Sequence, residues 1–344
     1  MVERGEVDAA RVMPHSAHRS RYHAVLGLIG RRLLFAVPVF GVVSFGVFLL
    51  AAASPFDPLD QYYGVRMNRA SEADLARARE QLGTDDSVFV QFGRWVGGVF
   101  TGDLGVSRSF RQPVTEVLAE RLPWTVLLCA VGLVLAIALA VTLGVLAAWR
   151  QGGWADRLIT ATGHALEGIP PFVLALLSIA VFSLALGWLP VAGLTDAGAG
   201  LSAGQVARHL ALPALVLGIS QAPWLVLHLR QSMLSSLADE HVTGARARGL
   251  GERLVVLRHA LPTALLPLIT LIGVRVPELV TGAVLVEEVF SWPGAAAAVV
   301  QAALAVDFPL LAALTLLAAG TTLLGSLFAD VTTALLDPRV ATDG

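Results

Sequence analysis

Long apolar runs without a charged side chain are the feature that most restricts how this chain can fold. A helix needs about 20 apolar residues to cross the hydrocarbon core of a bilayer. Five runs of this length lack Asp, Glu, Arg and Lys, and a sixth contains only Arg275 and Glu278. The runs are Leu33–Phe56, Leu122–Trp149, Gly168–Thr195, Leu210–Leu229, Thr263–Val286 and Phe308–Ala329. The sequence therefore predicts an all-α polytopic membrane protein with six transmembrane helices.

The composition agrees with this prediction and excludes several other classes. Hydrophobic residues make up 56% of the 344 residues and charged residues 15%, against about 25% charged in an ordinary soluble domain. The mean hydropathy is +0.71 and the net charge is −2, which argues against a disordered chain, a basic nucleic-acid-binding protein and most soluble enzymes. All 24 basic residues are arginine, so the chain has neither a Gly-Lys-Ser/Thr phosphate-binding loop nor a Schiff-base lysine.

Arginines are distributed unevenly between the loops, and this predicts the orientation of the spans. Fourteen lie before the first span, in the loops after the second and fourth spans, and in the tail, against Arg208 and eight in the segment 57–121. That segment is long enough to be a small folded unit, so its charges count for less. Short loops rich in arginine stay in the cytoplasm, so both termini are expected to be cytoplasmic. The expected organisation is an N-terminal arm (1–24), a first transmembrane helix (25–56), an extracytoplasmic segment (57–121), a core with the other helices (122–337) and a tail (338–344). The first run is longer than the about 7–15 apolar residues of a signal peptide, so we expect it to be retained as an anchor.

The extracytoplasmic segment carries two helical patterns. Ser71 has the chemistry of a helix start and Gly83 that of a helix stop, which predicts a helix through Gln81. Apolar residues between Phe89 and Val99 then recur at helical spacing. This second helix is expected either to lie on the outer leaflet or to form a docking surface for another protein.

The cytoplasmic loop after the fourth span, residues 233–262, carries the most specific pattern. Ser236 and Asp239 form a capping-box-like start for a short helix from Glu240 through Arg248. Gly249 and Gly251 interrupt the helix, and a second helix is expected from Glu252 until just before Pro262. Two short helices meeting at a glycine form a compact elbow that a partner's cleft can grip. The alternative is an ordinary basic cytoplasmic loop.

The elbow is similar to the signature loop of binding-protein-dependent ABC importer permeases. That signature runs Glu-Ala-Ala, three residues, Gly, nine residues, Ile, one residue and Leu-Pro. Here Thr243-Gly244-Ala245 precedes Gly249 by the same interval, and His259 stands two residues before Leu261-Pro262. The Gly and the Leu-Pro match, whereas Thr243, Gly244 and His259 replace the family's Glu, first Ala and Ile.

Within that superfamily the chain resembles the first of the two permeases of oligopeptide, dipeptide and nickel importers. Nine short motifs carry the likeness, in the same order and over nearly the whole length. They begin at Arg31, Gly102, Glu120, Ile169, Gly187, Ala245, Val289, Asp307 and Leu336, with a further match at Leu257 inside the elbow. Only residues 1–24 and the tail after Arg339 fall outside.

The resemblance implies a type I ABC importer permease fold in the cytoplasmic membrane of a bacterium. Such a permease pairs with a second homologous permease, two cytoplasmic ATPases that bind ATP and Mg²⁺, and an extracytoplasmic substrate-binding protein. The chain itself is then not an enzyme and holds no catalytic residue, cofactor or metal. The implied cargo is di- or oligopeptides, with nickel chelates or glutathione-like compounds as alternatives. The residues implied to couple it to an ATPase are Glu240, Thr243, Gly244, Ala245, Arg246, Ala247, Arg248, Gly249 and Leu250.

Several charged or aromatic residues in or near the spans are further candidates. Arg275 and Glu278 are expected to line the translocation pathway and contact peptide termini, or else to form an intrahelical ion pair. Glu287, Glu288 and Trp292 are expected at the outer gate or at the contact with the binding protein, with a hydrated helix end as the alternative for the two glutamates. Asp330 is expected to have a structural ion-pair partner.

Two other classes of protein compete with the importer. An ion-driven secondary transporter would use Arg275, Glu278 and Asp330 as relay groups and would need no ATPase. An intramembrane hydrolase is poorly supported, because the sequence has neither His-Glu-x-x-His nor Gly-x-Ser-x-Gly.

Overall fold

The computed structural model describes residues 15–54, 71 and 86–336 of the chain. These residues are almost entirely helical, with one small two-stranded antiparallel sheet near the outer end. The elements are α1 (His15–Ala52), α4 (Val88–Thr101), β1 (Val106–Ser107), β2 (Gln112–Pro113), α5 (Val114–Trp149), α6 (Trp154–Glu167), α7 (Pro171–Ser178), η2 (Ile179–Ala185), α8 (Ala203–Leu237), α9 (Glu240–Ala247), α10 (Glu252–Leu254), η3 (Val255–Ala260), α11 (Leu261–Val289), α12 (Ala295–Leu304) and α13 (Phe308–Leu336).

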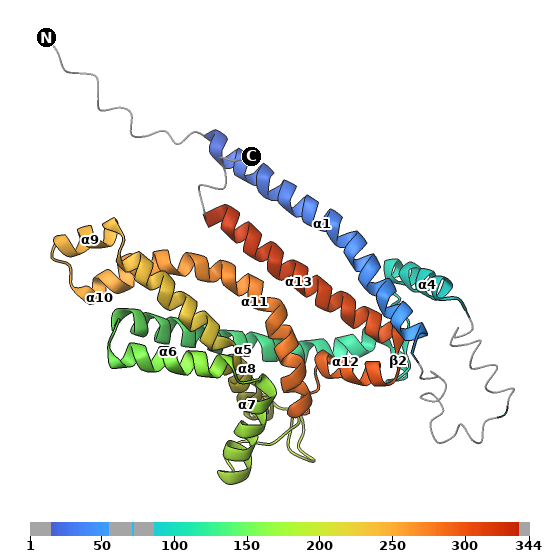
Figure 1. The fold of residues 1–344 in the computed structure, drawn as a ribbon. Helices are drawn as coiled ribbons and strands as arrows, with labels where there is room; N and C mark the ends of the chain where they lie inside the picture. The colour runs from blue at the N-terminus through green and yellow to red at the C-terminus, as the bar shows by residue number, and fades with distance from the viewer. Residues whose placement is uncertain (1–14, 55–70, 72–85, 337–344) are drawn as a thin grey trace.

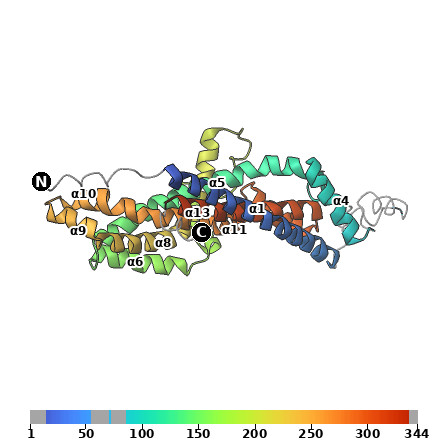
Figure 2. The same ribbon diagram turned by 90° about the horizontal axis from the view of Figure 1, so that it is seen from above.

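Five helices of the described chain are long and apolar enough to cross a membrane, and a bent pair supplies a sixth crossing. The five correspond to the first, second, fourth, fifth and sixth predicted spans. The long helices run roughly in one direction, with α9 and α10 at one end and α4, α12 and the hairpin at the other (Figures 1 and 2). The prediction of an all-α polytopic membrane protein is confirmed.

The third predicted span, Gly168–Thr195, is not one straight helix. It is helical only from Pro171 to Ala185, as α7 and the π-helix η2. The helix before it, α6, was not predicted; it ends at Glu167 and meets α7 at a bend of 104°. Consecutive prolines at 170 and 171 cause the break, because proline disfavours a helical residue before it and cannot donate its own backbone hydrogen bond. Helix formation resumes with Pro171 in its favoured first-turn position.

Helix boundaries also differ from the prediction at three further places. α1 begins at His15, ten residues inside the segment expected to be an unstructured arm, because an apolar span propagates helix into adjacent residues. α5 begins at Val114, ahead of the predicted start of the second span at Leu122, and carries Pro123 inside it. The short alanine-rich helix α12 was not predicted. The helix expected from Ser71 through Gln81 lies outside the described residues.

Close packing of α5 against α8 forms the centre of the molecule. Gly132 of α5 faces Leu217 of α8, and Gly218 of α8 faces Leu135 and the Gly132 carbonyl. A methyl group at position 218 would lie only 2.8 Å from the Leu135 Cβ. Small residues therefore allow the two helices to approach each other closely.

At the outer end, α4 packs within the chain. Trp95 is buried among Phe48 of α1 and Phe308 of α13, with ring centroids of Phe48 and Trp95 5.6 Å apart. The apolar face of α4 is therefore covered by α1 and α13, and this packing replaces the expected leaflet or partner contact for most of that face. Among the large apolar residues predicted to form this face of α4, only Phe89 is largely exposed.

A buried carboxylate fixes the hairpin to the start of α13. Asp307 accepts a 2.6 Å hydrogen bond from the Ser107 hydroxyl and a 2.9 Å bond from the Ser109 backbone N–H. At the inner end, Asp330 of α13 forms an ion pair with Arg32 of α1. The expectation of a structural partner for Asp330 is confirmed.

The α5–α8 contact makes a stability prediction. Replacing Gly218 by alanine forces a Cβ against Leu135 and should destabilise the protein by about 1–3 kcal/mol. Gly204→Ala is the matched control, because Gly204 lies in the same helix with open space around it. Thermal unfolding of the two purified variants in the same mild detergent measures the difference. Equal midpoints for Gly218→Ala and wild type would contradict the close contact.

Candidate functional site

The short helix α9 is the centre of the predicted elbow. Asp239 precedes it in an extended conformation, and its carbonyl accepts from the Val242 and Thr243 N–H groups. The helix ends at Gly249, whose φ of +79° is the left-handed conformation that favours glycine. The predicted short helix and its glycine stop are therefore present in the structure.

One face of α9 is buried and the other is exposed. Val242 and Ala245 are fully buried against Val255, Val256 and Ala260 of the following segment. Leu250 is half-buried. The other expected coupling residues are exposed, namely Glu240, Thr243, Gly244, Arg246, Ala247, Arg248 and Gly249. Within the expected set, Ala245 therefore anchors the helix, and the exposed residues form a continuous accessible surface.

Arg246 fixes α9 to the ends of both neighbouring long helices. Its guanidinium donates 2.8 and 3.2 Å hydrogen bonds to the Glu252 carboxylate and a 3.1 Å bond to the Leu237 carbonyl. The hydrogen bonds to Glu252 raise the pKa of the Arg246 guanidinium above its usual range. A buried 2.9 Å bond from the Ser236 hydroxyl to the Ala260 carbonyl adds a second connection. Arg246 therefore links α9 to the end of α8 and to the start of α10.

The second helix of the elbow does not end before Pro262. Helix continues without a break from Glu252 through α10, η3 and α11 to Val289. The π-helical segment η3 lies directly before Pro262 and accommodates the backbone hydrogen bond that proline cannot make. The second helix of the elbow and the fifth span are therefore one continuous helix.

The charged pair of the fifth span lies halfway along α11. Arg275 and Glu278 form an intrahelical ion pair. The Arg275 guanidinium also lies over the Trp224 ring of α8, 4.1 Å from its centroid. In this chain the Glu278 side chain is 58% exposed. The two residues thus form the intrahelical ion pair that was the alternative prediction. The Glu278 side chain nevertheless faces out of the bundle.

Two of the three expected outer residues are buried. Glu287 is fully buried. Its carboxylate accepts a 2.6 Å hydrogen bond from the Thr125 hydroxyl and a 3.0 Å hydrogen bond from the Ala297 N–H at the start of α12. Trp292 is buried, and its indole N–H donates a 3.1 Å hydrogen bond to the Trp124 carbonyl. Only Glu288 is exposed. In this conformation a binding protein cannot touch Glu287 or Trp292. Of the two glutamates, only Glu288 has the exposure expected of a hydrated helix end.

The Glu287 contacts hold the outer ends of three helices together. Thr125 of α5 donates to Glu287 of α11 and accepts from the Ala295 N–H of α12. The start of α12 is a favourable place for a carboxylate, because its N–H groups and dipole stabilise negative charge. Thr125 was not singled out from the sequence, and Asp307 was named only as the start of a motif, because the spacing of polar residues along the chain does not show which of them meet in space.

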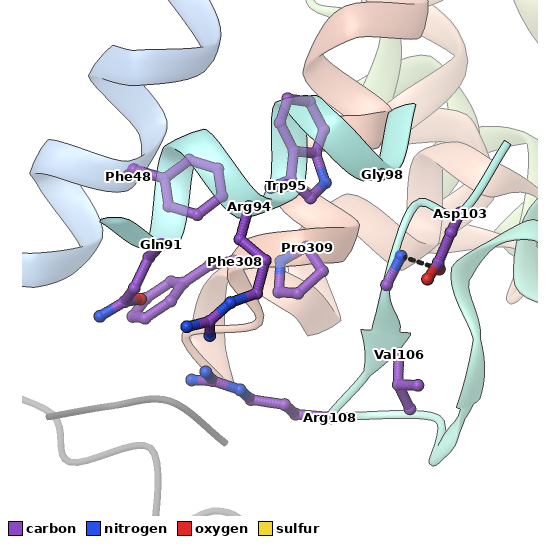
Figure 3. Close-up of a pocket in the computed structure, with 11 residues that line it drawn as sticks. Phe48, Gln91, Arg94, Trp95, Gly98, Asp103, Val106, Arg108, Phe308 and Pro309 are labelled. Atoms are coloured by element: carbon purple, nitrogen blue, oxygen red, sulfur yellow. Dashed lines mark hydrogen bonds between the residues drawn. The ribbon is translucent and has the colours of Figure 1, made fainter. Parts of the chain in front are cut away.

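A cavity of about 290 Å³ at the outer end is a further site that the sequence did not indicate (Figure 3). α1, α4, the hairpin and α13 line it, and Arg94 and Arg108 both extend toward it (Figure 3). Arg94 forms a 2.8 Å ion pair with Asp86, and Arg108 lies over the Phe308 ring, 4.7 Å from its centroid. Burial lowers the pKa of the Arg108 guanidinium, and the charge of Asp307 opposes that shift.

The described residues contain no group of three His, Cys, Asp or Glu side chains placed to hold a metal ion. Cys129 is half-buried among apolar side chains and packs against the core.

The chain matches two family models that together cover most of its length. Residues 140–342 match the binding-protein-dependent transport system inner membrane component, and residues 25–129 match the N-terminal domain of such membrane components. The chain belongs to this family, whose members are non-catalytic permease subunits of ABC transporters in the inner membrane. The type I permease fold expected from the sequence is confirmed.

Curated relatives cover nearly the same length. The oligopeptide transport system permease protein AppB of Bacillus subtilis is 34% identical over 311 residues, which are 90% of this chain and 98% of the relative. The glutathione transport system permease protein GsiC of Escherichia coli K12 is 32% identical over 319 residues, 92% of this chain and 99% of the relative.

The Glu287 contacts make a testable prediction. Glu287→Ala leaves the Thr125 hydroxyl and the first N–H groups of α12 without an acceptor, at a cost of about 1–3 kcal/mol for each buried group left unsatisfied. Glu288→Ala, one residue along and exposed, should change stability little. Thermal unfolding in detergent compares the two variants, and equal losses would show that Glu287 does not organise the outer end.

Proposed function

We propose that this chain is the permease subunit of an ATP-driven importer of peptides. The observation that carries the proposal is the exposed face of α9, which Arg246 joins to a helix that runs without a break from Glu252 to Val289. Relatives whose names specify oligopeptide and glutathione transport support peptides as the cargo, because glutathione is itself a small peptide. The nickel-chelate alternative receives no support from these names.

α9 is the proposed contact with an ATPase subunit. Its buried face gives it a fixed position, and its exposed face presents Ala247 and Arg248 for docking. Closure of two ATPase subunits on ATP and Mg²⁺ would move α9, and Arg246 would pass that movement to α8 and α10. Alternating access follows if two arrangements of the spans differ in their affinity for the ATP-bound subunits.

A second homologous permease is the proposed partner within the membrane. Glu278 is exposed halfway along a span, where lipid is an unfavourable neighbour for a carboxylate. Its face of α11 therefore borders a water-filled passage shared with a second permease. Both termini of this chain are proposed to lie in the cytoplasm.

At the outer face, Glu288 and the rim of the arginine-lined cavity are the proposed contacts for the binding protein. Glu287 and Trp292 act from inside the outer gate, holding α5, α11 and α12 together. The ion-driven transporter is not favoured, because Arg275, Glu278 and Asp330 are engaged in ion pairs and the family is that of ABC permeases.

Gly249 provides a test of the coupling role. A valine at φ +79° is strained by about 1–2 kcal/mol, so Gly249→Val should displace α9 and separate ATP hydrolysis from uptake. Gly251→Val is the matched control, because Gly251 has an extended conformation and open space around it. Uptake and ATPase activity are measured in proteoliposomes containing the complete importer. Normal, ATP-coupled uptake by Gly249→Val would overturn the role of the elbow.

Neighbouring alanines of α9 test the contact directly. In a chain with Cys129→Ala, a cysteine replacing the exposed Ala247 should form a disulfide or short crosslink to a cysteine-bearing ATPase subunit. A cysteine replacing the buried Ala245 should not. Gel mobility under oxidising conditions reads out the crosslink, and the absence of any ATPase adduct from position 247 contradicts the proposal.

A further inference from the structure

Six polar or aromatic side chains from three helices gather where the third crossing bends. α6 contributes the end of its last turn, α8 contributes its middle, and α11 contributes its charged pair. The residues are His164, Glu167, Trp224, His228, Arg275 and Glu278.

Direct contacts join the α8 and α11 residues. Arg275 lies over Trp224 and pairs with Glu278. The His228 ring lies against the Trp224 ring of the same helix, with the two ring centroids 3.9 Å apart. The His228 Nδ1 is 2.8 Å from the Trp224 carbonyl oxygen. Arg275 is thus held by an aromatic face and a carboxylate from its own chain.

Glu167 completes the group from α6. It is the last residue of α6, directly before the bend of 104°. Its carboxylate is 3.5 Å from the His164 Nδ1, and Gly163, one turn earlier in α6, meets the Leu227 side chain of α8. Arg275 lies within electrostatic reach of Glu167. Broken spans at mid-depth commonly form transport sites, because their helix ends leave polar groups available inside the membrane.

The position of these groups identifies their surroundings. His164, Glu167, His228 and Glu278 are exposed in this chain. Arg275 lies halfway along its span, and ionisable side chains at such depth face a water-filled cavity or a partner and not lipid. The three-helix cluster therefore faces the passage.

The balance of charge indicates what the cluster binds. It holds one guanidinium and two carboxylates, and Glu278 already pairs with Arg275. Glu167 has only the longer contact with His164 among the ion pairs of the described residues. It also stands at the C-terminal end of α6, where the helix dipole favours a cation. The cluster is thus complementary to a positively charged group.

We propose that Glu167 binds the ammonium group of a peptide in transit, beside the Trp224–Arg275–Glu278 contacts. This inference rests on the proposed function, since the ligand is the cargo of the importer. It adds to the passage a substrate-binding residue on a different helix from the charged pair seen in the sequence. The peptide is recognised by its amino group, which every unblocked peptide carries.

The test uses the complete importer in proteoliposomes, with radiolabelled alanine peptides as cargo. In a Cys129→Ala chain, Glu167→Cys should lower uptake about tenfold, the loss typical of a charge-assisted hydrogen bond. Modification of that cysteine with an anionic sulfonatoethyl methanethiosulfonate should restore most of the uptake, and a cationic trimethylammonium reagent should not. Glu116→Cys, at an exposed outer carboxylate, is the matched control.

ATP hydrolysis stimulated by loaded binding protein separates the possible failures. We expect it to stay at the wild-type level in Glu167→Cys, which shows that the variant is folded and coupled. Undiminished uptake by Glu167→Cys, or equal recovery with both reagents, overturns the role of Glu167 and leaves the importer intact. Absence of ATP-dependent peptide uptake by the wild type overturns the proposed function itself. If the cysteine variant does not fold, Glu167→Gln against Glu167→Asp makes the same comparison, with uptake retained only by the aspartate.

Discussion

The structure depends on how charged groups are accommodated in a medium without water. A carboxylate or guanidinium in the hydrocarbon region is tolerated only with a partner or on a wet face. Glu287 and Asp307 meet this condition through hydroxyl and backbone N–H donors at the outer end. At the inner end, Asp156 accepts 2.5 and 2.8 Å hydrogen bonds from Arg230. These contacts also join segments that are distant in sequence, such as α5 with α11 and the hairpin with α13. The hydrogen bonds that offset the cost of burying a charge therefore also fix the fold.

The elbow derives its mechanical properties from its connections at both ends. Arg246 and Ser236 join it to α8 and to the segment before α11. From Glu252 onward the chain is one helix as far as Val289, so a displacement at its cytoplasmic end reaches Arg275 without passing through a flexible loop. The π-helical segment lies where Pro262 would otherwise interrupt the helix, and Pro267 is a second proline along this path.

The spans and the elbow could be predicted from sequence because their determinants are local. Apolar runs report span length, and the glycine at position 249 reports a left-handed helix end. The bend after Glu167 was missed because the apolar run beginning at Gly168 continues past two prolines without a charge. The burial of Glu287 and Trp292 could not be predicted, since it depends on Thr125 and Trp124 of a distant helix and on an unpredicted helix, α12. Distinguishing a buried carboxylate from a surface one requires the tertiary contacts.

The contacts at the two ends differ in a way that favours movement at the inner end. Glu287 and Asp307 join the outer ends of α5, α11, α12, α13 and the hairpin through buried, mostly short hydrogen bonds. At the inner end, α9 contacts α8 and α10 through the half-exposed Arg246–Glu252 ion pair, and α6 follows α8 through Asp156 and Arg230. Because α6, α8 and α11 also carry the cluster around Arg275, the proposed pull on α9 would move all three of its walls while their outer connections stayed fixed. The bend after Glu167 is where such a movement would be absorbed, since the prolines there already interrupt the backbone hydrogen bonds.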